Sequence, residues 1–272
     1  MEPSFYFKKW EELKSGSSRP DPEELRRLSA QVAHSFLDGY LKDHFIRQEY
    51  IDLLCDMATS FESTALNSPA ADALFGIIIE SLCDEFEELQ VVTYNQVMTG
   101  LIEYCRRLPG GEWLDRELRN FGLSSRSMLQ QRIAALRNRS GRVNKPEQVK
   151  KIFILSRVTL GADVAITSVF LQRLRTVFPD AGIVLIGPEK LQEVYNFQDG
   201  VRIRKVDYAR RGGLLERLAT WREVLEAIRK EADTLSADEY LVFDPDSRLS
   251  QLGVLPVCPE ESYFFFNSRT GK

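Results

Sequence analysis

The second half of the chain alternates short apolar runs with segments of helical spacing, and this alternation constrains the fold more than any other feature. The first run, IFILS at residues 152–156, is typical of a strand buried on both faces of a parallel sheet. Strands that alternate with helices imply βαβ units with right-handed crossovers. We therefore predict a Rossmann-like α/β domain with strands at 152–156, 182–186, 201–206, 240–243 and 263–266, and helices at 163–177, 188–195 and 213–230.

Helical spacing dominates the first half of the chain. Apolar residues recur there at steps of three and four, beginning with Leu25, Leu28, Val32, Phe36 and Tyr40. Further helices are expected at 51–57, 71–89, 94–108, 112–121 and 125–137. Residues 138–151 are polar and contain Gly and Pro, which is typical of a linker. The sequence thus predicts an all-α helical domain at 1–143 and a Rossmann-like α/β domain at 144–272.

Composition argues against several classes of function. A net charge of −4 disfavours a nucleic-acid partner, since nucleic acids attract basic surfaces. The cysteines lack C-x-x-C spacing and the chain has only two histidines, so we predict reduced thiols and no zinc site built from Cys and His. The N-terminus is too charged for a signal peptide, and no apolar run approaches the roughly 20 residues that span a bilayer. We expect a cytoplasmic protein without a transmembrane segment, and peripheral membrane contact and oligomeric state stay open.

The loop after the first strand carries the most informative polar residues. In such sheets, ligands bind outside the carboxyl ends of the strands. The sequence SRVTLGADV predicts a tight turn at Gly161 and places Asp163 at the start of a helix. Arg157, Thr159 and Gly161 are the substrate-binding candidates of this loop. Two interpretations of Asp163 stay open. It is either an N-cap that accepts bonds from the backbone of Ala165 or Ile166, or a general base beside a substrate hydroxyl.

A second group of candidates follows the fourth strand, in the segment DPDSRLSQLG. Asp246, Ser247 and Arg248 are candidate substrate-binding residues there. Asp244 and Asp246 also form a D-x-D pattern, which can hold a divalent cation, although an Asp-Pro turn with a cap at Asp246 or Ser247 explains the same residues.

A third group lies between the third strand and the helix at 213–230. Arg210 and Arg211 precede two glycines at a helix N-terminus, where guanidinium groups and free N–H groups can bind a phosphate or carboxylate. Solvated loop charges are the alternative. Trp221 falls on the predicted buried stripe of this helix and is expected in the core.

The segment KIFILSRVTLGADVAITSVFLQRLRTVFPDAGIVLIGP resembles the opening of glycosyltransferase family nine, the ADP-heptose:lipopolysaccharide heptosyltransferase-like proteins. The family's Gly-Asp-Val pattern corresponds here to Gly161-Ala162-Asp163-Val164, which is one residue longer. The Phe-Pro-Asp-Ala turn at 178–181 and the strand end at 185–188 also fit. The resemblance covers residues 150–266.

The resemblance implies the acceptor-side half of a GT-B fold. It implies inverting sugar transfer from a nucleotide-sugar donor to a carbohydrate acceptor of lipopolysaccharide type, with Asp163 as the base and no metal or other cofactor. Under this reading, Arg210, Arg211 and Arg248 contact anionic groups.

Such enzymes bind the donor in a second Rossmann-like domain, which we do not find before Lys272. We therefore expect the α/β domain to be truncated, and we expect residues 1–272 alone to transfer no sugar. The alternative is a non-catalytic binding or interaction protein that combines a helical domain with a degenerate Rossmann scaffold.

Overall fold

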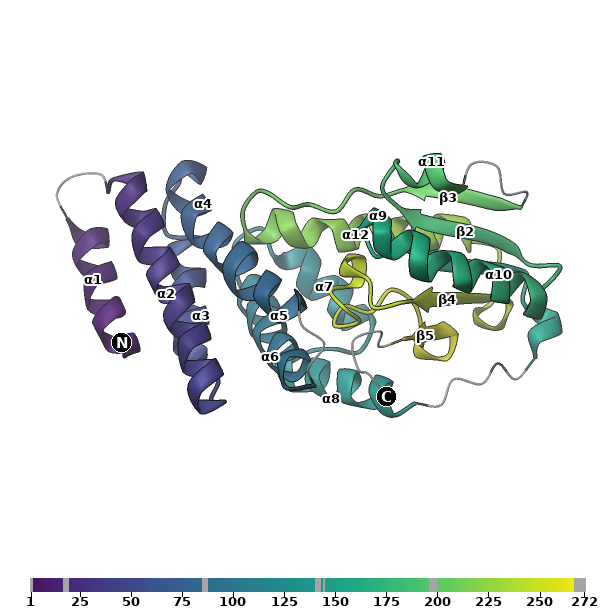
Figure 1. Cartoon of the computed structure of the whole chain (residues 1–272), viewed down its shortest axis with the longest axis horizontal. Helices are drawn as coiled ribbons and strands as arrows, with labels where there is room; N and C mark the ends of the chain where they lie inside the picture. Colours follow the sequence, from purple (N-terminus) through teal and green to yellow (C-terminus); the bar gives the residue numbers. More distant parts are fainter. Residues whose placement is uncertain are drawn as a thin grey trace.

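The protein is an α/β structure in which a helical part adjoins a parallel sheet (Figure 1). The computed structural model describes residues 2–16, 20–84, 88–139, 143, 145–195 and 200–266. The α-helices before the sheet are α1 (Pro3–Ser15), α2 (Pro22–Asp43), α3 (Gln48–Met57), α4 (Thr64–Ala73), α5 (Glu80–Asp84), α6 (Glu88–Cys105), α7 (Glu112–Asn120) and α8 (Arg126–Asn138). A π-helical segment, Leu74–Ile79, joins α4 to α5. Helix α1 lies at the end of the molecule farthest from the sheet.

The sheet has the strand order β3-β2-β1-β4-β5, and every pairing is parallel. Its strands are β1 (Lys151–Leu155), β2 (Gly182–Gly187), β3 (Val201–Lys205), β4 (Tyr240–Asp244) and β5 (Tyr263–Phe265). Residue Ile152 of β1 pairs with Ile183 of β2 and Leu241 of β4. The predicted parallel α/β fold is therefore confirmed.

Helices cover both faces of the sheet, which explains why its central strands are apolar throughout (Figure 1). Ile152 and Ile154 belong to a core cluster with residues of α10 (Ser168–Val177) and α11 (Leu191–Tyr195). Phe153 and Leu155 point to the other face, where they join a cluster with α12 (Leu214–Glu231). Successive side chains of a strand point to opposite faces, so the apolar residues of β1 contribute to the core clusters on both faces of the sheet.

The core on the α12 face continues into the helical part. The Trp221 ring on α12 lies 6.3 Å from the Trp113 ring on α7, measured between centroids. Arg229 of α12 forms an ion pair of 2.6 Å with Glu117 of α7. The domain boundary at residue 143 stays a prediction, and residues 140–142 and 144 of the predicted linker lie outside the described residues.

The helix after β1 starts earlier than predicted. It begins as α9 (Leu160–Ala162), continues as a π-helical segment at Asp163–Thr167, and ends as α10. Gly161 therefore lies within a helix, and the predicted tight turn at this glycine is wrong. The left-handed residue of the loop is instead Val158, with a φ of 69°.

Candidate functional site

The loops that follow β1 and β4 meet at the carboxyl edge of the sheet. The strand order reverses between these two strands, and ligands of open α/β sheets bind at such a switch point. The Ser247 hydroxyl donates to the backbone oxygen of Ser156, and Arg157 Nη2 lies 3.9 Å from Asp246 Oδ2. Three of the predicted site residues, Arg157, Asp246 and Ser247, are thus brought together.

Asp163 lies under this junction, and its carboxylate is held by the loop that precedes it. Oδ2 accepts a hydrogen bond of 2.7 Å from Ser156 Oγ, and Oδ1 accepts one of 2.8 Å from the Arg157 backbone N–H. Thr167 Oγ1 donates to Oδ1 at 3.0 Å. The helix has already begun at Leu160, and none of these donors is the backbone of Ala165 or Ile166, so the N-cap interpretation is wrong.

Burial dominates the electrostatics of this carboxylate. Asp163 is 1% exposed, and burial raises its pKa although the bonds from Ser156, Arg157 and Thr167 act in the opposite direction. A carboxylate whose pKa is raised binds a proton more readily, which suits a general base.

The helix after β1 contains a π-helical segment at the position of Asp163. A π turn contains one more residue than an α turn, and this segment begins at Asp163, directly after Ala162. The Asp163 carbonyl accepts from the Ser168 N–H and from the Tyr195 hydroxyl at 2.6 Å. Tyr195, on α11, therefore stabilises the segment that carries Asp163.

Val158 stores strain in the same loop. A left-handed conformation costs a β-branched residue about 1–2 kcal/mol. Its backbone N–H donates to Ser156 Oγ at 2.9 Å, so the serine that holds Asp163 also holds the strained turn. Thr159 and Gly161 are exposed, and the donors to the Asp163 carboxylate described above come from neither residue.

The β4 loop is organised around a buried Asp244. Its carboxylate accepts from the Ser247 N–H at 2.7 Å, from the Tyr263 hydroxyl at 2.6 Å and from the Ser250 hydroxyl. Ser247 caps the short helical turn Arg248–Ser250 by accepting from the Leu249 N–H at 3.1 Å, as the turn-and-cap interpretation predicts. Asp246 is 3% exposed, with a φ of 61°.

Asp244 should make stability depend on pH. Burial raises its pKa from 3.8 to about 6, so the folded state favours the protonated acid. Because the unfolded state releases this proton at lower pH, the free energy of unfolding should fall by up to about 3 kcal/mol as pH rises from about 4 through 6. Urea unfolding of the wild type and Asp244→Asn at pH 4.5 and 7 measures the difference. Equal pH dependence in both proteins would contradict the assignment.

The remaining cationic candidates lie apart from Asp163. The Arg248 guanidinium forms a two-pronged ion pair with Glu80 of α5, with Nη2 2.7 Å from Oε2, so it ties the β4 loop to the helical part. Arg210 and Arg211 are exposed in the segment between β3 and α12, two strands away from β1.

The sequence analysis did not identify several residues that contact Asp163. No sequence pattern pointed to Ser156 or Tyr195. Ser156 reaches Asp163 only because the loop between them folds back, and Tyr195 lies on a separate helix. Thr167 could have been found, since a residue four positions after Asp163 lies on the same helical face.

The comparisons with known proteins add no family. No protein-family model, curated protein or solved structure matched the chain. None of the helices in the described part combines the length and apolar character that a bilayer crossing requires. The described residues contain no group of three or more His, Cys, Asp or Glu side chains arranged to hold a metal ion.

Proposed function

We propose that this chain is the acceptor-side part of a metal-independent, inverting glycosyltransferase. In this proposal Asp163 is the general base that activates a hydroxyl of a carbohydrate acceptor towards a nucleotide-sugar donor. The observation that carries the proposal is a buried carboxylate with a raised pKa below the switch point of a parallel sheet. The likeness of residues 150–266 to glycosyltransferase family nine suggests sugar transfer as the chemistry.

The proposed reaction requires no metal ion. Asp163 removes the proton of the acceptor hydroxyl, and the resulting oxygen bonds to the anomeric carbon of the donor sugar. The bond from that carbon to the diphosphate breaks, and the nucleoside diphosphate leaves with the electron pair. Arg157, which is half-buried at the junction of the two loops, is suited to stabilise negative charge there.

Catalysis requires the loop 156–159 to open, because two residues of this loop, Ser156 and Arg157, donate hydrogen bonds to the carboxylate. The strained Val158 lowers the cost of opening, since its left-handed conformation is relieved when the loop moves. Acceptor binding that displaces the Ser156 hydroxyl would expose the carboxylate only when a substrate is present.

The same contacts favour a second candidate, a non-catalytic binding protein. Three donors on a 1%-exposed carboxylate are also what a purely structural aspartate has. Release of nucleoside diphosphate from a panel of nucleotide-sugars, with lipopolysaccharide core oligosaccharides as acceptors, separates the two. Acceptor-dependent release supports transfer, and acceptor binding without release by the complete protein supports the second candidate.

Arg210 and Arg211 should contribute to the binding of anionic acceptors. We expect the double substitution Arg210→Gln and Arg211→Gln to raise KM for a phosphorylated acceptor about tenfold with little change in kcat, because these exposed charges act through binding. The double substitution Arg26→Gln and Arg222→Gln is the matched control, since it also removes two exposed arginines, which pair with Glu23 and Glu226. An equal effect of both changes would show that only overall charge matters.

A further inference from the structure

A cleft of about 570 Å³ lies between α8, the segment that joins α7 to α8, and the turn before β5. Its apolar wall is formed by Phe121, Leu123, Ala135 and Leu136. This volume is in the range of small-molecule sites, which are lined mainly by apolar groups with few polar ones. The cleft shares no lining residue with the Asp163 site and does not depend on the proposed sugar transfer.

Arg132 also lines the cleft and has an unsatisfied donor. Its side chain is 7% exposed, its Nε donates to Glu260 Oε1 at 2.5 Å, and its Nη1 donates to the Gly253 carbonyl at 2.6 Å. Nη2 is buried and has no hydrogen-bond partner among the described residues. The guanidinium carbon lies 5.4 Å from the Tyr263 ring centroid, which is a cation–π contact. This contact does not supply a hydrogen-bond acceptor for Nη2.

A buried guanidinium donor without an acceptor is costly. Such a group loses its bonds to water on folding, and native proteins keep few of them without a compensating role. A small shift of the guanidinium towards the cleft would let an anionic group there accept from Nη2.

The charged side chains that line the cleft carry a net charge of +1, which one anion would neutralise. Arg132 and Arg139 contribute two positive charges, and Glu260 contributes one negative charge that both arginines approach, with Arg139 Nη1 3.9 Å from Glu260 Oε2. The surplus of one positive charge beside an apolar wall matches a ligand with one acidic group and an apolar body.

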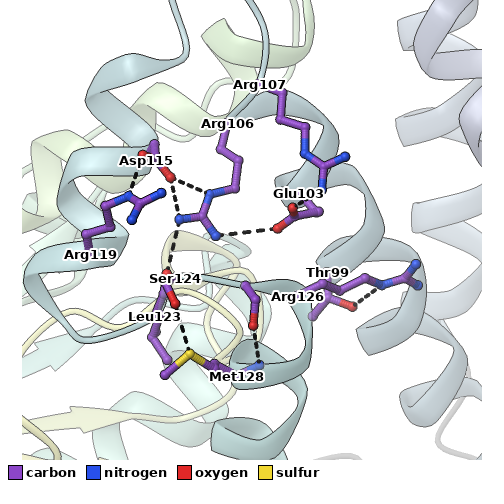
Figure 2. Close-up of polar contacts among 11 residues, drawn as sticks. Thr99, Glu103, Arg106, Arg107, Asp115, Arg119, Leu123, Ser124, Arg126 and Met128 are labelled. Atoms are coloured by element: carbon purple, nitrogen blue, oxygen red, sulfur yellow. Dashed lines mark hydrogen bonds and ion pairs between the residues drawn. The ribbon is translucent and has the colours of Figure 1, made fainter.

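Leu123 of the cleft wall is held by an ion-pair network around Arg106 (Figure 2). The buried Arg106 of α6 donates from Nε to Asp115 of α7 at 2.6 Å and from Nη2 to the Leu123 carbonyl at 3.2 Å. Arg119 Nε donates to the other oxygen of Asp115 at 2.7 Å. Arg106 thus fixes the segment that carries Leu123, so the cleft is formed before any ligand binds.

We propose that this cleft binds a small amphipathic anion, a carboxylate or phosphate attached to an apolar chain or ring. The apolar part packs on the α8 wall, and the acidic group lies against Arg132 and Arg139.

Calorimetric titration of the complete protein with decanoate, and with decanol as the neutral comparison, tests this proposal. Decanoate should bind at least about tenfold more tightly than decanol, because two arginines recognise its charge. Equal affinity for both compounds would overturn the proposal.

Two substitutions locate the site. Ala135→Trp fills the cleft from its exposed wall and should weaken decanoate binding at least about tenfold, whereas Gln131→Trp, an exposed change on the same helix outside the cleft, should not. Glu260→Gln removes the competing negative charge and should tighten decanoate binding about fivefold without affecting decanol. A gain of affinity cannot come from misfolding, so unchanged or weaker decanoate binding by this variant would contradict the proposal.

Discussion

Trp221→Ala is expected to lower the free energy of unfolding by about 4 kcal/mol. The indole is 1% exposed on α12, and it belongs to the core cluster that the sheet and the helical part share. Its Nε1–H also donates to the Pro256 carbonyl at 2.7 Å, in the segment that leads to β5. Removing it leaves a cavity against Trp113 and an unpaired buried carbonyl, and both effects destabilise the fold.

Urea unfolding monitored by circular dichroism measures this loss. The neighbouring exposed residue gives the control, since Arg222→Ala should change the free energy of unfolding by no more than about 0.5 kcal/mol. Trp221→Phe keeps most of the ring and loses only the N–H, so its cost should be about 1–2 kcal/mol. A loss below about 1.5 kcal/mol for Trp221→Ala would mean that Trp221 does not join the two parts.

The strands were predictable because their signal is local. The run at 152–156 is apolar on both faces, since α10 and α12 cover opposite sides of the sheet, and its observed limits, Lys151–Leu155, differ by one residue. Trp221 was likewise predicted in the core from its spacing in an amphipathic helix, and its 1% exposure confirms this.

The orientation of Asp163 could not be predicted in the same way. A carboxylate near an expected helix start is compatible with a cap and with a base, and the choice depends on where the helix begins. The helix begins at Leu160, earlier than predicted, and it contains a π turn. A pattern of apolar spacing reveals neither feature. The bond from Ser156 then depends on how the intervening loop closes.

Contacts between distant residues were also beyond sequence reasoning. Arg248 was expected to bind an anionic group of a substrate, but it pairs with Glu80, which is 168 positions away in the chain. Arg132 contacts Glu260, 128 positions away, and no local pattern distinguishes these arginines from solvated ones.

Asp163→Asn is expected to reduce turnover about a thousandfold if Asp163 is the base. The amide has nearly the same shape but cannot take the proton of an acceptor hydroxyl. It also disturbs the bonds from Ser156, the Arg157 backbone and Thr167, so a loss of stability of about 1–2 kcal/mol is expected with it. Thr167→Val is the matched control, because it removes one of these bonds and leaves the carboxylate in place.

The rate of nucleoside diphosphate release by the complete protein, compared among the wild type, Asp163→Asn and Thr167→Val, tests the central claim most directly. Urea unfolding of the same samples shows whether the two variants are destabilised to a similar extent. We predict that Thr167→Val keeps turnover within about tenfold of the wild type, whereas Asp163→Asn loses about a thousandfold. Equal turnover by Asp163→Asn and Thr167→Val would contradict the account and leave Asp163 with a structural role alone.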